Sequence, residues 1–222
     1  LVSMPLCLPA AFYDRPVLDV AADLLGATIT HARVTVRLTE VEAYAGLGDP
    51  GSHAFRGPTR RTAVLFGQPG GLYVYFTYGM HWCANLVCGP AGQGAAVLLR
   101  AGEVVDGEPM ARSRRGDRCR PRDLARGPAR LAVALGLTGE HNGLLVTGAG
   151  SPVVVAAGAP ADAARVRTGP RVGVSGAGGD GAAYPWRFWL DGELSVSPYR
   201  PAVSRRAPGG QSPAAPAGVE AH

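Results

Sequence analysis

The sequence predicts an α+β fold, a single domain in which a curved, mainly antiparallel β-sheet carries peripheral helices. Its 222 residues are enough for one globular domain with a hydrophobic core. From residue 27 to residue 101, short apolar segments are separated by clusters of turn residues, which is typical of neighbouring strands. The 32 glycines and 19 prolines favour turns and short elements over long helices.

A helix is expected first, between Pro16 and Gly26. Asp14 can cap its start, Pro16 suits its first turn, and Gly26 ends it. The strands that follow are expected at residues 34–44, 72–78, 81–88 and 95–101.

The second half of the chain predicts shorter elements. Residues 110–126 are rich in arginine and poor in apolar side chains, so we expect a mobile, cationic loop there. A short helix is expected at 128–135, ended by Gly136. Further short strands are expected within 143–157, 172–174 and 187–196. The domain is expected to span residues 11–200, between a loose leader at 1–10 and a disordered tail at 201–222 that is rich in Pro, Ala and Gly.

Charge and hydropathy indicate which kinds of partner and location are compatible with the sequence. The formal net charge of +5 is compatible with nucleic acid without demonstrating it. No apolar run approaches the ~18 residues that a membrane span requires. The first residues lack a positively charged region, so no signal peptide is predicted and the chain is expected in the cytoplasm.

Familiar ligand-binding motifs are either absent from the sequence or lack the structural context that they require. The four cysteines form no C-x-x-C pair, and we predict neither a metal site nor a disulfide framework. Gly176-x-Gly178-x-x-Gly181 matches a dinucleotide fingerprint literally. The residues after it are typical of a strand, whereas the fingerprint requires a helix, so this match indicates a glycine-rich turn.

Carboxylates mark the end of the strand at 34–44. Side chains alternate between faces, so the face that begins with apolar residues ends with Glu40, Glu42 and Tyr44. A carboxylate on a core-facing row is costly unless it is paired or lines a cavity. On this pattern alone an ion pair with arginine explains the carboxylates better than catalysis does.

The next strands add aromatic and polar side chains. Tyr78 and Met80 flank the turn between two expected strands, where small polar residues are usual. They indicate either packing against the core or a wedge that enters a base stack. Asn85 lies in an otherwise apolar strand and needs hydrogen-bond partners if buried. The last of these strands ends at Arg100.

Several long motifs run through the chain. They are Thr39-Glu40-Val41-Glu42-Ala43-Tyr44, Ser52-His53-Ala54-Phe55-Arg56-Gly57, the run from Leu72 to Asn85, Ala96-Val97-Leu98-Leu99-Arg100-Ala101, Gly127-Pro128-Ala129-Arg130-Leu131 and Gly169-Pro170-Arg171-Val172-Gly173. These motifs are long and specific, and in them the chain resembles the alkyladenine (3-methyladenine) DNA glycosylase family over about residues 12–197. The sequence departs from the family pattern at 58–62 and 176–184.

The resemblance implies a base-excision-repair enzyme that flips a damaged purine out of double-stranded DNA and hydrolyses its N-glycosidic bond. It implies Glu42 as the residue that activates water, with Arg100 beside it. Glu40 is the alternative carboxylate, but the match places the catalytic glutamate two positions before Tyr44. The other residues it implies are Tyr44, His53, Tyr75 and Asn85 in the base pocket and Tyr78 as the intercalating wedge. Because the chain has no lysine, phosphate contacts are expected from arginines, backbone amides and hydroxyls. The candidates at the DNA backbone are Met80, Arg56, Arg60, Arg61 and the arginines from Arg112 to Arg126, and a solvated surface charge explains any one of these arginines equally well.

The absence of lysine bears on the reaction. Glycosylases that also cleave the strand commonly use an amine to form a Schiff base, and these 222 residues contain no lysine side chain. Only the terminal amine could take this role, and we therefore expect simple hydrolysis that leaves an abasic site. The protein is also expected to act as a monomer without a cofactor. Two alternatives stay open, a non-catalytic nucleic-acid-binding domain of the same fold and a hydrolase of free nucleosides.

Overall fold

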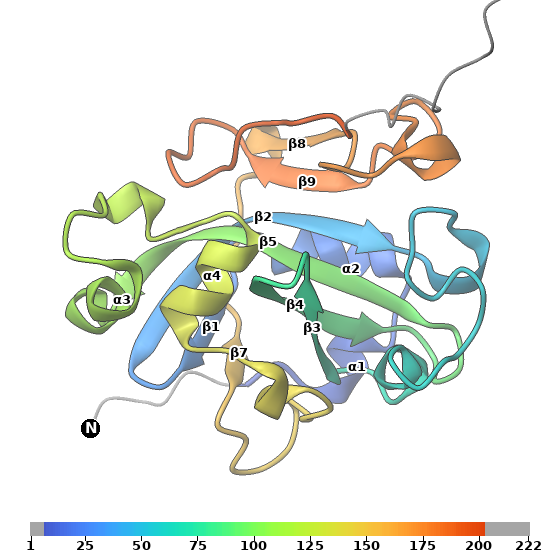
Figure 1. The fold of residues 1–222 in the computed structure, drawn as a ribbon, viewed down its shortest axis with the longest axis horizontal. Coiled ribbons are helices and arrows are strands. Elements are labelled where there is room, and N and C mark those ends of the chain that lie inside the picture. The colour runs from blue at the N-terminus through green and yellow to red at the C-terminus, as the bar shows by residue number, and fades with distance from the viewer. Residues whose placement is uncertain (1–6, 203–222) are drawn as a thin grey trace, which may run out of the picture.

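A computed structural model of the protein describes residues 7–202. Its framework is a curved antiparallel sheet with the strand order β3-β4-β5-β2-β1-β7, as Figure 1 shows. The strands are β1 Thr28–His31, β2 Val34–Tyr44, β3 Leu72–Thr77, β4 His81–Cys88, β5 Ala95–Asp106, β6 Ala125–Arg126, β7 Val154–Ala156, β8 Val166–Gly169 and β9 Arg187–Leu190. The helices are α1 Ala10–Tyr13, α2 Val17–Leu24, α3 Glu108–Arg115 and α4 Pro128–Leu135. The predicted α+β class is confirmed.

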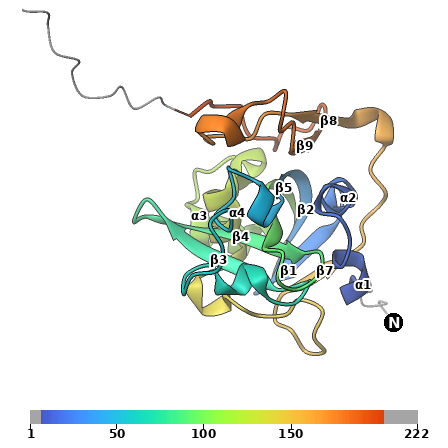
Figure 2. The ribbon, with the colours of Figure 1, turned by 90° about the vertical axis from the view of Figure 1, so that its right-hand side faces the viewer.

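Strand β2 is the centre of the sheet. One of its edges pairs with β5, while the other pairs first with β1 and then, from Glu40 to Glu42, with β9. The β8–β9 hairpin extends the sheet and lies above the rest of the molecule in Figure 2. A segment near the C-terminus is therefore placed beside the two carboxylates of β2.

Helices cover the sheet and close one hydrophobic core. Helix α2 packs on β2 and β5, and α4 packs on β4, β5 and α3. The buried cluster joins side chains from these helices and strands, among them Val20, Leu24, Leu38, Val41, Leu131 and Leu135. Because helices this short are marginal alone, their stability depends on this packing. Within residues 7–202, no helix has the length and apolar character needed to cross a membrane.

The faces of β2 differ from the prediction. Val34, Val36 and Leu38 lie in the core, but the next core residues are Val41 and Ala43. The pairing with β5 is irregular between Leu38 and Glu40, where an extra residue in β2 shifts the alternation. Glu40 and Glu42 therefore lie on the opposite face from Leu38, and the prediction of one continuous face was wrong.

Several element predictions need correction. Asp14 does not cap α2, whose N-cap is Pro16 without a side-chain hydrogen bond; Asp14 instead follows the short helix α1. The strand predicted at 72–78 ends at Thr77 because Tyr78 begins a turn. Strand β5 continues beyond residue 101 to Asp106, because the long strand β2 supplies partners there.

The predicted cationic loop at 110–126 is also wrong. This segment contains most of α3, a 3-10 turn at Pro121–Asp123 and strand β6. Ala111 is buried against the core, and Glu108 pairs with Arg112 one turn later in α3. Arginine and alanine are good helix formers, so a polar helix with one buried alanine is stable here.

The later strands are shorter than predicted. Only Val154–Ala156 of 143–157 and Arg187–Leu190 of 187–196 are strands. Residues 172–174 form no strand, because the Val172 N–H bonds a carboxylate instead of a neighbouring strand. The glycine-rich segment is a short turn at Gly176–Gly179 without a following helix, as expected, and the helix at 128–135 is confirmed.

The ends of the described chain are partly attached to the sheet. Cys7 forms a β-bridge with Ala156, so this part of the predicted leader is not loose. The rest of the predicted leader up to residue 6, and the predicted tail from residue 203, lie outside the described residues. All four cysteines are free thiols.

Candidate active site

A cavity of about 390 Å³ opens on the outer face of the sheet. Seven of the residues predicted for the site line it, namely Glu42, Tyr44, His53, Tyr75, Tyr78, Asn85 and Arg100. They come from β2, β3, β4, β5, the β3–β4 turn and the segment around residue 53. Met80, Arg56, Arg60 and Arg61 are not part of the wall.

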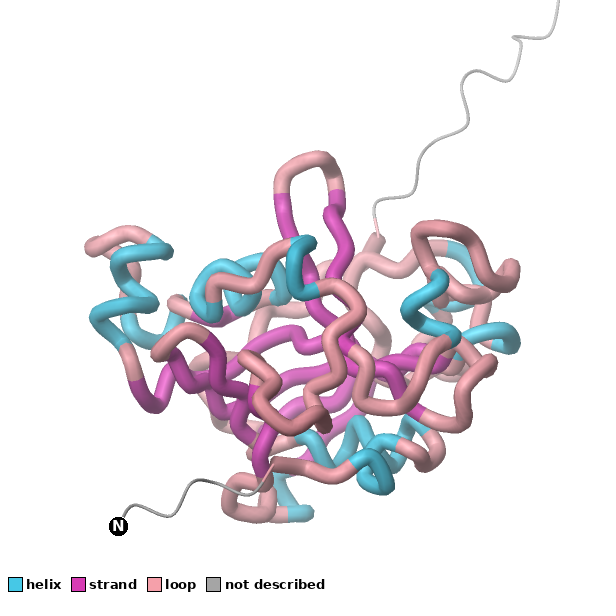
Figure 3. Tube along the Cα trace, turned by 90° about the horizontal axis from the view of Figure 1, so that it is seen from below, coloured by secondary structure: helices cyan, strands magenta, loops and turns pink. Residues whose placement is uncertain are grey.

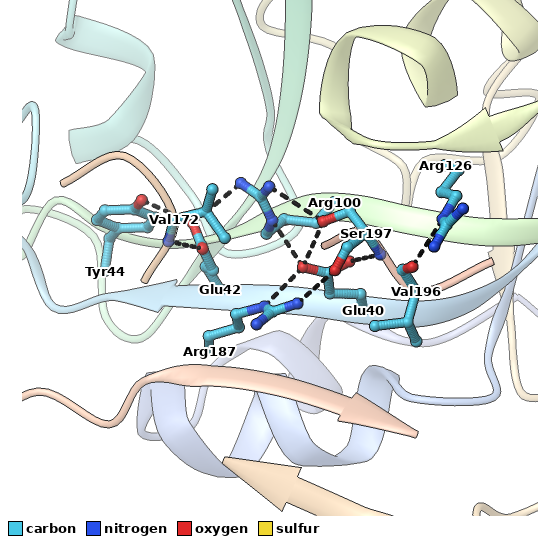
Figure 4. A network of polar contacts seen from close by, with 9 residues as sticks. All are labelled: Glu40, Glu42, Tyr44, Arg100, Arg126, Val172, Arg187, Val196 and Ser197. Carbon is cyan, nitrogen blue, oxygen red and sulfur yellow. Dashed lines mark hydrogen bonds and ion pairs between the residues drawn. The ribbon is translucent and has the colours of Figure 1, made fainter. Parts of the chain in front are cut away.

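Glu42 is buried completely at the wall of this cavity. One carboxylate oxygen accepts from the Val172 backbone N–H at 2.6 Å, and the other accepts from the Tyr44 hydroxyl at 2.9 Å. Arg100 Nη1 approaches this second oxygen at 3.5 Å (Figure 4). The carboxylate is thus held by three donors from different elements, and it faces the cavity.

Burial raises the pKa of the Glu42 carboxyl above its ordinary value. Arg100, the Val172 N–H and the Tyr44 hydroxyl each lower it, and the nearby Glu40 raises it further. A carboxyl held in this way is a better proton acceptor than an exposed glutamate, provided that it is ionised.

Glu40 has a different environment. One of its oxygens accepts from Arg100 Nε at 2.9 Å, Arg187 Nε at 2.8 Å and the Ser197 hydroxyl at 2.9 Å. The other accepts from the Ser197 backbone N–H at 2.6 Å. Glu40 is fully buried and does not line the cavity. An ion pair with arginine, which the strand pattern favoured, therefore explains the burial of Glu40. It does not fully explain Glu42, which also lines the cavity.

Aromatic rings form one wall of the cavity. The Tyr73 and Tyr75 rings are stacked with centroids 5.5 Å apart, and the His53 ring meets Tyr75 edge-on at 4.7 Å. The guanidinium of Arg61 lies 5.9 Å from the Tyr75 ring centroid. Desolvation at the cavity lowers the pKa of His53, and the charge of Arg61 lowers it further. Both effects favour the neutral form of the imidazole.

Asn85 closes the cavity from β4. The residue is 6 % exposed, and its side-chain amide donates to the Tyr73 carbonyl at 3.1 Å. This bond to the neighbouring strand fixes the orientation of the amide, which also lines the cavity. The expectation that a buried asparagine needs partners is confirmed.

The β3–β4 turn projects away from the body of the molecule, as the hairpin at the top of Figure 3 shows. Tyr78 at its tip is 86 % exposed and has a backbone φ of 50°, and Gly79 follows with 65°. Met80, beside them, is 66 % exposed. The sequence left two possibilities for these side chains, and the exposure excludes packing against the core.

One buried ion pair was missed in the sequence. Arg171 is fully buried and binds both oxygens of Asp49, and its guanidinium lies 4.5 Å from the Tyr44 ring centroid. It also donates to the Ala43 carbonyl. The motif around residue 171 was visible, but the partner at residue 49 was not. The pair anchors the segment whose next residue, Val172, binds Glu42.

The three arginines of α3 bind other groups of the protein. Arg112 binds Glu108 and the Cys119 carbonyl, Arg114 binds the Ala134 and Ala32 carbonyls, and Arg115 binds the Leu124 carbonyl. Arg56, Arg60 and Arg61 are exposed, and of these Arg61 donates to the Phe76 carbonyl at 3.3 Å and lies near the Tyr75 ring of the cavity wall.

Known proteins are similar to this chain over most of its length. The family model described as Methylpurine-DNA glycosylase (MPG) matches residues 11–194. A protein of Streptomyces avermitilis is 52% identical over 200 residues, covering 88% of this chain and 92% of its own length. One of Frankia casuarinae is 54% identical over 199 residues (86% and 92%), and one of Leifsonia xyli is 56% identical over 194 residues (82% and 88%). All three carry the name "Putative 3-methyladenine DNA glycosylase". With a match of this length, the chain belongs to the methylpurine-DNA glycosylase family.

Proposed function

We propose that this protein is a DNA glycosylase of base excision repair that releases 3-methyladenine and related damaged purines from double-stranded DNA. One observation carries the proposal: the buried Glu42 carboxylate lies at the wall of a cavity whose other side is aromatic. The names of the close relatives agree with this reaction.

The cavity suits a single flipped base. Its volume of about 390 Å³ is near the lower end of ligand pockets, which are typically ~300–1,000 Å³. The faces of Tyr44 and Tyr75 attract the positive charge of an alkylated purine. A neutral His53 does not repel that charge. Asn85 has a fixed amide in the same cavity and excludes normal guanine by contact with its exocyclic amine.

The reaction we propose is hydrolysis. A water molecule bound to Glu42 attacks C1′ of the flipped nucleotide, the new C–O bond forms, and the bond between C1′ and the purine nitrogen breaks. The bonding electrons leave with the purine, and the water proton passes to Glu42. Ionised Glu42 also stabilises the positive charge that develops on the sugar. Arg100 orients Glu42 and lies close enough to contact the flipped nucleotide.

Access to the glycosidic bond requires that the base leave the duplex. Extrusion costs a few kcal/mol, and an aromatic side chain that takes the place of the base offsets part of it. Tyr78 is the exposed aromatic residue at the projecting turn and also borders the cavity. We therefore assign it as the wedge, with Met80 and the exposed Arg56, Arg60 and Arg61 at the DNA backbone.

The reaction is expected to stop at the abasic site. Strand cleavage through a Schiff base needs an amine nucleophile, and the sequence holds no lysine. Base release without nicking is therefore part of the proposal.

The test is single-turnover base release from a duplex that contains one hypoxanthine or ethenoadenine, and from methylated DNA. Glu42→Gln should bind the duplex but release base about 10²–10⁴-fold more slowly. Glu140→Gln, at an exposed site, is the matched control. If the wild type binds duplex DNA and releases no base from any substrate, the chain is a binding domain of the same fold. If it cleaves free nucleosides only, a nucleoside hydrolase replaces the proposal.

A further inference from the structure

Ser197 lies outside the cavity wall but is connected to both carboxylates of the site. It follows β9 in a segment that crosses the end of β2, and it is 7 % exposed. Its hydroxyl accepts from Arg100 Nη2 at 3.3 Å and donates to a Glu40 oxygen at 2.9 Å (Figure 4). The proposed reaction gives Ser197 no role, so these contacts need a separate explanation.

The three nitrogens of Arg100 each have a different partner. Nε binds Glu40 at 2.9 Å, Nη2 binds Ser197, and only Nη1 reaches Glu42, at 3.5 Å. A free guanidinium beside a carboxylate usually forms two parallel, shorter bonds. Glu40 and Ser197 thus hold two of the three guanidinium nitrogens away from Glu42.

The backbone of the Ser197 segment is fixed from two sides. Arg126 Nε donates to the Val196 carbonyl at 2.8 Å, and Arg187 Nη2 donates to the Ser197 carbonyl at 2.7 Å. The Ser197 N–H binds Glu40. These bonds do not depend on the hydroxyl, so the segment stays in place when the hydroxyl alone is removed.

We propose that Ser197 is a positioning residue, whose hydroxyl together with Glu40 keeps Arg100 from pairing fully with Glu42 and so leaves the carboxylate free to bind the attacking water. The inference rests on the proposed glycosylase reaction and deepens it. Ser197 then acts on the reaction through Arg100, although it does not line the cavity itself.

The proposal predicts a change in the titration of Glu42. The groups that act on this carboxyl are Arg100, Tyr44 and Glu40, and it also interacts with Arg171 and Tyr75. Without the hydroxyl, only Arg100 is released to move, and it approaches Glu42 more closely. A closer cation lowers the pKa of a carboxyl, so the acid limb of the rate profile should move to lower pH while the maximal rate falls.

The experiment compares Ser197→Ala with the wild type on a hypoxanthine-containing duplex, from pH 4 to pH 9. We expect single-turnover base release to fall about tenfold at the plateau, with an acid limb at lower pH and the Kd for the duplex unchanged within about twofold. The matched control is Ser195→Ala. Ser195 is equally buried in the same segment, but its hydroxyl binds Thr39 and not Arg100. It should behave as the wild type in rate and pH profile.

The outcomes separate the two proposals. If the wild type is active and Ser197→Ala matches it, the positioning role is wrong and the glycosylase function stands. Equal losses in Ser195→Ala and Ser197→Ala, with a lower Tm and no shift in pH profile, also overturn the positioning role, because they indicate a structural contribution alone. If the wild type releases no base, the proposed function fails and this inference with it.

Discussion

At the scale of single residues, buried charges dominate this molecule. Glu40, Glu42, Asp49, Arg100, Arg171 and Arg187 are all less than 9 % exposed. Two arginines compensate Glu40, and a bidentate arginine compensates Asp49. Glu42 receives only a long contact from Arg100, and burial still raises its pKa. The one carboxylate that faces the cavity is therefore the one whose charge is compensated least.

Glu42→Gln should be at least as stable as the wild type at neutral pH. The raised pKa means that folding favours protonated Glu42 relative to the unfolded chain. Its contribution to stability is fully present below the unfolded pKa and is lost as the pH rises through the folded pKa. The difference in Tm between Glu42→Gln and wild type should therefore grow in favour of the variant between about pH 4 and pH 8.

Differential scanning fluorimetry over this pH range measures the effect, with Glu140→Gln as the control for an exposed glutamate. A variant that is less stable than the wild type at pH 8 would contradict it. Such a result would mean that the ion pair between Arg100 and charged Glu42 stabilises the fold by more than the burial of that charge costs.

Asp49→Asn should be strongly destabilising. It leaves the Arg171 guanidinium buried without a counter-charge, which costs about 3–5 kcal/mol in the free energy of unfolding. Replacing Arg171 by Met as well removes the unpaired charge, so the double variant should recover part of this loss. Urea denaturation of both single variants and the double variant gives the coupling energy. Additive losses would show that the two side chains act independently.

At the scale of elements, the β3–β4 hairpin combines exposure with backbone strain. Tyr78 occupies the left-handed region, which costs a residue with a Cβ roughly 1–2 kcal/mol, and its side chain is largely exposed. Nothing in the folding of the chain favours tyrosine at this tip. The residue is therefore better explained by contact with a partner than by stability.

Tyr78→Asn should raise stability and lower activity. Asparagine tolerates the left-handed conformation better than tyrosine, so the free energy of unfolding should rise by up to about 1 kcal/mol. Base release from duplex DNA should slow, because the wedge is lost. Met80→Asn is the control for the stability measurement, since Met80 is exposed but has no positive φ. A loss of stability in Tyr78→Asn would show that the tyrosine ring has packing partners.

Some elements could be predicted from the sequence and others could not. The alternation of apolar and polar residues predicted both ends of β2 and of β4 correctly, because each strand has one apolar face and clear turn residues at its ends. The bulge near Thr39 has no signature in composition, so the faces of Glu40 and Glu42 were assigned wrongly. Helix α3 was missed because the carbonyl partners of its arginines lie as far away as residues 32 and 134.

At the scale of the whole molecule, the cavity exists only when distant segments meet. Val172 reaches Glu42 across 130 positions, and Arg171 reaches Asp49 across 122. The resemblance identified seven residues that line the cavity without any knowledge of these contacts. The resemblance could not identify Asp49 or Ser197. Each of them acts through a contact with a residue that is distant in the sequence, and the sequence alone does not reveal such contacts.

The arginines divide into exposed side chains, which we propose for phosphate binding, and side chains that bind within the protein. Arg60 is exposed, whereas Arg114 binds the Ala134 carbonyl at the end of α4 and the Ala32 carbonyl in the β1–β2 turn. When a side chain that neutralises one DNA phosphate is removed, the slope of log K against log salt becomes shallower by about 0.9. Arg60→Ala should therefore weaken duplex binding, reduce this slope by that amount and leave Tm unchanged. Arg114→Ala should keep the slope and reduce the free energy of unfolding by about 1–3 kcal/mol, since two carbonyls are left without a charged donor.

Fluorescence anisotropy with an undamaged duplex at several salt concentrations, together with urea denaturation, distinguishes these cases. The undamaged duplex isolates binding to the DNA backbone from binding in the base pocket. The reverse pattern, a reduced slope for Arg114→Ala and none for Arg60→Ala, would place the DNA on the α3 side of the molecule, away from the cavity. Since the projecting hairpin and the cavity share one side, that result would conflict with base flipping by Tyr78 and would require a different mode of binding.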